Sequence, residues 1–292
     1  MALNIQTLKT RSLTAIIFVA VMLVGLFYNY WSFLLLFSII HFGCWVEYQK
    51  LMSIIDRDYS NISIFHKYAI MLCGYGFVLW NVNESLQPFG LPIAEIGKWM
   101  VIIIAVILPI KEIVLSKKNN VKVLGFSVLG LAYISLAWGL MISLYNLCSV
   151  PTNNTRHQFH FQYSIPIILI ASIWINDTMA YLVGSIIGKN PLSKISPKKT
   201  WEGTIGGAIL AVVVVGSFFY FFIDKNYWYV VVIIALIAAV IGTLGDLLES
   251  KLKRMANVKD SGSFMPGHGG FLDRFDSLIL ATPIVWLFLF FL

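Results

Sequence analysis

The amino-acid sequence predicts an all-α polytopic membrane protein, and three observations support this prediction. Hydrophobic residues make up 59% of the 292-residue chain and charged residues only 12%, which is about half of the charged share in a soluble domain. The mean hydropathy is +0.81. The apolar residues form long continuous runs rather than the short alternating segments of a membrane β-barrel.

Nine of these runs have the length and composition expected of helices that cross a membrane, which takes about 20 mostly apolar residues. In chain order they lie at about 12–29, 31–48, 67–82, 95–110, 123–147, 164–187, 204–223, 227–248 and 276–292. The third is short and the fourth contains Pro109. The first resembles a signal peptide, but no small-residue cleavage site follows it, so we expect a span that is retained.

The basic residues predict the orientation of these spans. When the loops are assigned alternately to the two sides, one side receives 18 of the 21 Lys and Arg residues, all except Lys98, Arg156 and Lys225. This bias places the N-terminus in the cytoplasm and the C-terminus outside. The net charge of +7 is then a consequence of topology, and we expect no nucleic-acid partner.

The polar residues divide the chain unevenly. Residues 1–165 contain about five spans with ordinary loops, which we interpret as an N-terminal transmembrane region. Residues 166–292 carry the unusual polar groups and the cytoplasmic loops 188–203 and 249–275, so we expect the catalytic region there. The three cysteines show neither disulfide nor zinc-ligand spacing.

The sixth span contains Asn176 and Asp177 near its middle. A carboxylate inside a span is costly and usually faces a cavity in which it has a function. The alternative is a structural carboxylate that is hydrogen-bonded to a neighbouring helix. The following loop, "SKISPKKTWEGTIGG", places Lys198 and Lys199 just before the start of the seventh span. Such a helix start, with free backbone N–H groups and two lysines, could bind an anion, although the lysines could also serve topology alone.

Two further pairs of acidic residues lie at the cytoplasmic ends of the last two spans. Asp246 and Glu249 are three positions apart on one helical face, and Asp273 and Asp276 repeat this spacing in "PGHGGFLDRFDS". Helix capping would explain one of the latter aspartates but not both. Carboxylates gathered at one membrane face with many lysines and arginines are typical of Mg²⁺ bound together with substrate phosphates. The pattern therefore predicts phosphorus transfer between a nucleotide and a membrane component.

The segment 250–276, "SKLKRMANVKDSGSFMPGHGGFLDRFD", resembles the signature of the phosphatidate cytidylyltransferases, the CDP-diacylglycerol synthases. The one departure, Met265 in place of another large apolar residue, is conservative. "SPKKTWEGTIGG" is similar to the preceding cytoplasmic loop of that family. The specific match covers about residues 176–277, whereas the first half of the chain matches in hydropathy alone.

This resemblance implies that CTP and phosphatidate react to CDP-diacylglycerol and pyrophosphate in phospholipid biosynthesis. Asp246, Asp273 and Asp276 would be catalytic and would bind Mg²⁺ together with Asp177, and K⁺ is implied as a second cation in bacterial members. Binding of the substrate phosphates is expected of Lys198, Lys199, Lys253, Arg254, Lys259, His268 and Arg274. The expected partners are CTP, phosphatidate and membrane lipid at the plasma (inner) membrane, with the active site facing the cytoplasm; a homodimer is left open.

Two alternative functions remain open from the sequence. A CTP-dependent kinase for a polyprenol or phytol alcohol would use a similar site but transfer the γ-phosphoryl group. An ion-coupled transporter would use Asp177 and Asp246 as cation sites. The lack of an inverted repeat and the position of the polar groups at one membrane face both count against the transporter.

Overall fold

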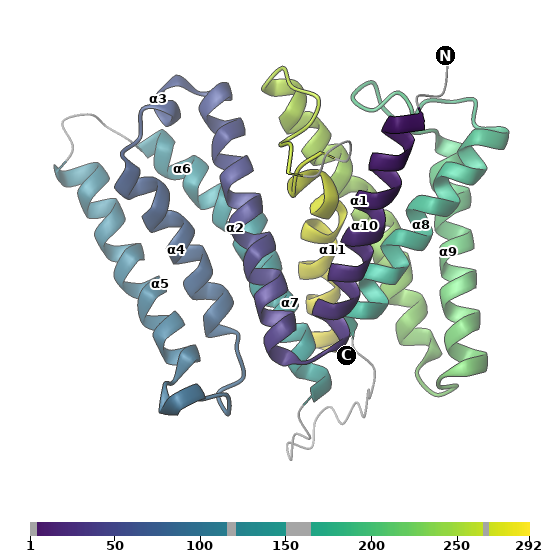
Figure 1. The fold of residues 1–292 in the computed structure, drawn as a ribbon, viewed down its shortest axis with the longest axis horizontal. Coiled ribbons are helices and arrows are strands. Elements are labelled where there is room, and N and C mark those ends of the chain that lie inside the picture. The colour runs from purple at the N-terminus through teal and green to yellow at the C-terminus, as the bar shows by residue number, and fades with distance from the viewer. Residues whose placement is uncertain (1–4, 116–120, 150–164, 265–268) are drawn as a thin grey trace. The chain divides into compact units, whose positions relative to one another are not determined.

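The computed structural model describes residues 5–115, 121–149, 165–264 and 269–292, and these residues form helices joined by loops (Figure 1). The described part contains no strand, only an isolated antiparallel bridge between Pro191 and Thr200. The prediction of an all-α polytopic membrane protein is therefore confirmed.

Every predicted span corresponds to a helix. Among the described residues, seven helical stretches are long and apolar enough to cross a membrane: Tyr30–Ile55, Ile93–Ile113, Val121–Leu147, Ile165–Ile187, Trp201–Phe222, Trp228–Met255 and Leu272–Phe291. The first and third predicted spans appear as shorter apolar helices, Leu13–Phe27 and Ile64–Trp80. The number of crossings and the orientation remain predictions.

The chain folds into two compact units. The first comprises Met1–Ile142 and Met255–Phe275, and the second comprises Ser143–Arg254 and Asp276–Leu292. The first part of the chain forms α1 (Ile5–Phe27), α2 (Tyr30–Ile55), α3 (Arg57–Ser60), α4 (Ile64–Trp80), α5 (Ile93–Pro109), α6 (Val121–Gly130) and α7 (Leu136–Ser149). It is followed by α8 (Ile165–Ile187), α9 (Trp201–Phe222), α10 (Trp228–Met255) and α11 (Leu272–Phe291). The predicted division into residues 1–165 and 166–292 remains a prediction.

Several helices begin at a polar side chain that binds their first free N–H groups. The Asn29 side chain accepts a hydrogen bond from the Ser32 N–H at 2.8 Å, and the Ser32 hydroxyl accepts one from the Asn29 N–H at 3.0 Å. This reciprocal pair fixes the start of α2. The Thr200 hydroxyl accepts from the Gly203 N–H at 3.2 Å and starts α9 in the same way.

Large aromatic side chains form the core of the first unit. Trp45, Trp138 and Phe37 are fully buried. The Trp138 ring packs 5.5 Å from Phe37 and 5.7 Å from Phe275, measured between ring centroids. Lipid tails are as apolar as these rings, so close packing rather than removal from water stabilises their contacts. The Trp138–Phe275 contact holds the segment that precedes Asp276 against α7.

Small residues bring the helices of the second unit close together. Figure 1 shows α8 and α9 running side by side. At their contact, a Cβ on Gly203 would lie 2.8 Å from the Ala180 carbonyl oxygen, so only glycine permits this spacing.

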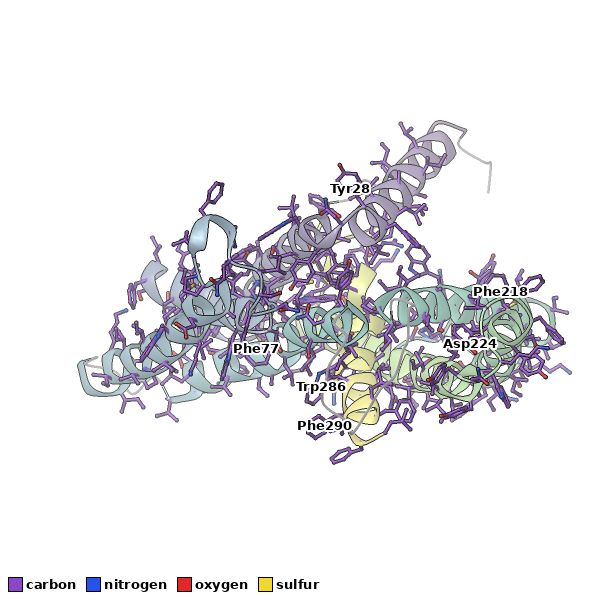
Figure 2. The ribbon with its side chains drawn as sticks, turned by 90° about the horizontal axis from the view of Figure 1, so that it is seen from below. Tyr28, Phe77, Phe218, Asp224, Trp286 and Phe290 are labelled. Atoms are coloured by element: carbon purple, nitrogen blue, oxygen red, sulfur yellow. The ribbon has the colours of Figure 1, made fainter. Side chains whose placement is uncertain are left out.

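On α11, Trp286 and Phe290 stack at 5.2 Å between centroids (Figure 2), and the Trp286 indole N–H donates to Ser143 at 2.9 Å.

Candidate active site

Three carboxylates of the second unit meet where α10 and α11 lie together. Asp246 and Glu249 come from adjacent turns of α10, and Asp276 comes from the first turns of α11. One carboxylate oxygen from each residue lies within 4.8 Å of those of the other two. Glu249 is fully buried, while Asp246 and Asp276 are partly accessible. We call Asp246, Glu249 and Asp276 the acidic cluster.

A glycine of α10 allows α11 to approach at this point. A Cβ at Gly245 would lie 2.5 Å from the Asp276 carbonyl oxygen and 3.1 Å from the Ser277 Cα atom. A larger residue would therefore push α11 away from α10. Because Gly245 directly precedes Asp246, the close backbone contact and the meeting of the carboxylates occur at the same level of the two helices.

Two lysines partly neutralise the acidic cluster. Lys199, from the loop between α8 and α9, forms an ion pair with Asp246. Lys253, one turn beyond Glu249 on α10, forms an ion pair with that residue. The Lys253 side chain is 11% exposed and the Glu249 side chain 0% exposed, so this second pair is buried, whereas Lys199 remains accessible at 32%.

Asp177 of α8 lies beside this group. It is close enough to interact electrostatically with Lys199 and with Asp246. The neighbouring Asn176 is buried, and its amide nitrogen lies 3.5 Å from an Asp177 oxygen. The Asn176 side-chain oxygen is buried and makes no hydrogen bond within the described part of the chain, which leaves an oxygen acceptor available near the site.

The charges of the site fit a divalent cation. Asp177, Asp246, Glu249 and Asp276 carry four negative charges when ionised, and Lys199 and Lys253 balance two of them. Uncompensated carboxylates in a poorly hydrated site are strongly unfavourable. Hard cations such as Mg²⁺ prefer carboxylate oxygens as ligands. The donor set is therefore suitable for Mg²⁺, with Asp246, Glu249 and Asp276 as the residues that would hold it.

Glu202 on the first turn of α9 holds the lysine-bearing loop. Its carboxylate accepts hydrogen bonds from the backbone N–H groups of Lys189 and Asn190, both at 3.2 Å, and from the Asn190 side chain at 2.6 Å. The Pro191–Thr200 bridge closes the same loop. These contacts fix the end of the loop from which Lys199 reaches Asp246.

The other predicted site residues have different surroundings. Asp273 belongs to the first unit, where one of its oxygens accepts hydrogen bonds from the Ser261 N–H at 2.9 Å and the Gly270 N–H at 2.8 Å. Lys198, Arg254, Lys259 and Arg274 have exposed side chains. His268 lies outside the described residues. The roles predicted for these residues in metal or substrate binding remain predictions.

Two acidic residues were not among the predicted site residues. Glu249 completes the cluster, and its spacing of three positions from Asp246 was the sequence signal for it. Glu47 of α2 binds the loop before α11. The signal for Glu47 was its position inside a predicted span, because a carboxylate in an apolar run is unusual.

The model of the cytidylyltransferase family matches residues 9–292. A phosphatidate cytidylyltransferase of Bacillus subtilis is 38% identical over 216 residues, which cover 73% of this chain and 76% of the relative.

Two further relatives match shorter parts of the chain. A phosphatidate cytidylyltransferase of Synechocystis sp. is 42% identical over 124 residues, or 42% of each chain. One of Staphylococcus haemolyticus is 44% identical over 114 residues, which cover 39% of this chain and 44% of that protein. These two similarities thus span less than half of the relatives concerned.

Proposed function

This chain belongs to the cytidylyltransferase family and is a membrane nucleotidyltransferase, and from that premise we propose that it converts CTP and phosphatidate into CDP-diacylglycerol and pyrophosphate. The observation that carries this proposal is the meeting of Asp246, Glu249 and Asp276 with two lysines at the ends of apolar helices. Such a site can serve a charged nucleotide and a lipid phosphate together.

The chemistry that we propose is direct displacement at phosphorus. A phosphate oxygen of phosphatidate attacks the α-phosphorus of CTP, a new P–O–P bond forms, and the bond to pyrophosphate breaks. The attacking oxygen is already anionic near neutral pH, so the site needs no strong general base. The protein's contribution is to position the two phosphates and to reduce their repulsion.

The residues of the site divide this work between them. Mg²⁺, bound by the acidic cluster, would supply positive charge to the phosphate oxygens as the reaction proceeds. Lys199 is accessible and already close to Asp246, so it is suited to bind a phosphate of CTP or of the lipid. Lys253 is buried against Glu249 and is suited to balance the charge of that carboxylate. The need for Mg²⁺, and for K⁺ as a second cation, is part of this proposal.

We further propose that the site faces the cytoplasm from the plasma (inner) membrane. The lysine-rich loop between α8 and α9 and the end of α10 carry the basic excess typical of cytoplasmic loops. Soluble CTP and membrane-bound phosphatidate would both reach the site there.

Radiolabelled CTP provides the test. Purified protein in detergent is incubated with Mg²⁺, phosphatidate and CTP labelled at the α-phosphorus. Cytidylyl transfer puts the label into the lipid fraction and releases unlabelled pyrophosphate. Label that appears only in CDP would instead indicate a lipid kinase, and the absence of any turnover with phosphatidate would refute the proposed reaction.

A further inference from the structure

A carboxylate from the second helix lies against the start of the eleventh. Glu47 of α2 is 7% exposed. One of its oxygens accepts a hydrogen bond from the backbone N–H of Phe271 at 2.9 Å. The other accepts one from the Leu272 N–H at 2.9 Å and one from the Ser261 hydroxyl at 2.7 Å. Glu47 and its three partners all belong to the first compact unit.

The loop before α11 is shaped around this carboxylate. A Cβ atom at Gly262 would lie 2.2 Å from a Glu47 oxygen, and a Cβ atom at Gly270 would lie equally close to the same oxygen. Neither position accepts a larger residue unless the carboxylate moves. Two glycines of the loop are therefore explained by the close approach of Glu47.

The hydrogen-bond donors around the Glu47 carboxylate are neutral groups. Among the ion pairs of the described residues, none includes Glu47. Its charge is instead stabilised by two N–H groups at a helix N-terminus, where the helix dipole also favours an anion. Placing a carboxylate in an apolar helix costs free energy. We therefore expect Glu47 to have a function at the start of α11.

Asp273 holds the same loop from the other side. One of its oxygens accepts hydrogen bonds from the backbone N–H groups of Ser261 and Gly270. The Ser261 hydroxyl lies within hydrogen-bond distance of both the Glu47 and the Asp273 carboxylates. The loop end at Ser261 and the loop end at Gly270 are thus joined through two carboxylates. This arrangement fixes the first turn of α11.

The first turn of α11 determines where Asp276 lies. Leu272, bound by Glu47, is the first residue of α11, and Asp276 follows four positions later on the same helical face. A shift or rotation of the first turn would therefore move the Asp276 carboxylate with it.

We propose that Glu47 is a positioning residue that sets the placement of the metal-binding carboxylate Asp276. Glu47 touches neither metal nor substrate in this role; it acts through the start of α11. The inference rests on the proposed function in so far as Asp276 binds a divalent metal. Groups that orient metal ligands in this indirect way typically change metal affinity or activity by about 10- to 100-fold when they are replaced.

The experiment compares Glu47→Gln with the wild-type protein in two measurements. Glutamine keeps the size of the side chain but offers one acceptor oxygen, so it cannot accept from both Phe271 and Leu272 through separate oxygens. The first measurement is direct Mn²⁺ binding, followed by electron paramagnetic resonance. The second is the Mg²⁺ concentration that gives half-maximal cytidylyl transfer. We expect Glu47→Gln to weaken Mn²⁺ binding and to raise this Mg²⁺ concentration, each by about tenfold or more.

Gln49→Leu is the matched control. Gln49 lies on the same helix, is also 7% exposed, and donates its side-chain hydrogen bond to the Lys67 carbonyl oxygen at 2.9 Å, away from the loop. This substitution should lower thermal stability without changing either metal measurement. Ser261→Ala provides a milder second variant, because it removes the hydroxyl that Glu47 shares with Asp273 and leaves both helix N–H groups in place. It should shift both metal measurements in the same direction as Glu47→Gln, by a smaller factor.

Unchanged metal binding in Glu47→Gln, or in Ser261→Ala if Glu47→Gln does not fold, would overturn the inference. An equal shift in Gln49→Leu would also overturn it, because the effect would then follow stability alone. A different result would refute the proposed reaction. If the wild-type protein binds Mn²⁺ but transfers no cytidylyl group, the reaction is wrong, and weaker Mn²⁺ binding in Glu47→Gln would still support the positioning role.

Discussion

Lys199 forms an ion pair with Asp246, and this contact joins the loop before α9 to the acidic cluster on α10 and α11. The same lysine interacts electrostatically with Asp177 and Asp276. A cation between several carboxylates has two opposing effects in a metal site. It offsets the mutual repulsion of the carboxylates, and it competes with the metal for them.

Replacement of Lys199 should therefore shift two constants in opposite directions. In Lys199→Ala we expect the KM for CTP or phosphatidate to rise by about three- to tenfold, because a phosphate loses a charged partner. The Mg²⁺ concentration for half-maximal activity should fall, because the acidic cluster loses a competing cation. Steady-state kinetics over a range of Mg²⁺ concentrations measure both. Lys194→Ala, an exposed lysine of the same loop, should change neither constant.

The acidic cluster itself should be essential for turnover. Asp246→Asn and Asp276→Asn each remove one charged metal ligand but keep the size of the side chain, so we expect cytidylyl transfer to fall by about 100-fold or more in each variant. The rate of label transfer from CTP into lipid at saturating Mg²⁺ measures this loss.

Asp224→Asn is the control for these two variants. Asp224 lies in the connection between α9 and α10 (Figure 2) and accepts a hydrogen bond from the Asn226 N–H at 2.8 Å, a bond that asparagine can also accept. Its activity should match that of the wild-type protein. Activity near the wild-type level in Asp246→Asn or Asp276→Asn would remove that residue from the metal site.

The spans and the acidic residues of the last two helices could be predicted from the sequence because both are local patterns. Whether an apolar run can cross a membrane depends on its length and composition and not on its packing partners. Asp246 and Glu249 likewise share one helix face because they are three positions apart. Each of the nine predicted runs accordingly overlaps one of the apolar helical stretches found among the described residues, seven of them long and two shorter.

The partners of these residues could not be predicted in the same way, because they depend on packing between distant segments. Ser261 binds Glu47 across 214 positions of the chain, and nothing local to either residue indicates the other. The pairing of Lys199 with Asp246, rather than of Lys198 or Lys194, likewise depends on how the loop closes through Glu202. The loop contacts of Asp273 belong to the same class, because its spacing from Asp276 suggested a second metal ligand and gave no sign of Ser261.

Variants of Glu249 and Lys253 distinguish an effect on metal binding from an effect on protein stability. Glu249→Gln leaves a buried lysine without its ion-pair partner and removes one carboxylate from the acidic cluster. We expect a loss of about 3 kcal/mol in the free energy of unfolding and a rise of about tenfold in the Mg²⁺ concentration for half-maximal activity. Thermal unfolding in detergent and a Mg²⁺ titration measure the two effects.

The double variant Glu249→Gln with Lys253→Met distinguishes these effects. It removes both charges of the buried pair, so stability should return toward the wild-type value. The Mg²⁺ requirement should stay high, because the carboxylate is still missing. If the double variant recovers both stability and Mg²⁺ affinity, Glu249 does not bind the metal.

Glu202 should act on catalysis only through Lys199. Glu202→Gln weakens the hydrogen bonds to Lys189 and Asn190 that hold the lysine-bearing loop. We therefore expect KM to rise as in Lys199→Ala, by a factor of about three. Two variants that affect one contact are not additive. Adding Glu202→Gln to Lys199→Ala should therefore cause little further change in KM, whereas independent roles would multiply the two factors. Ser193→Ala, which removes a hydrogen bond within the loop to the Ile195 N–H, serves as the control and should leave KM unchanged if Glu202 is the residue that fixes the position of Lys199.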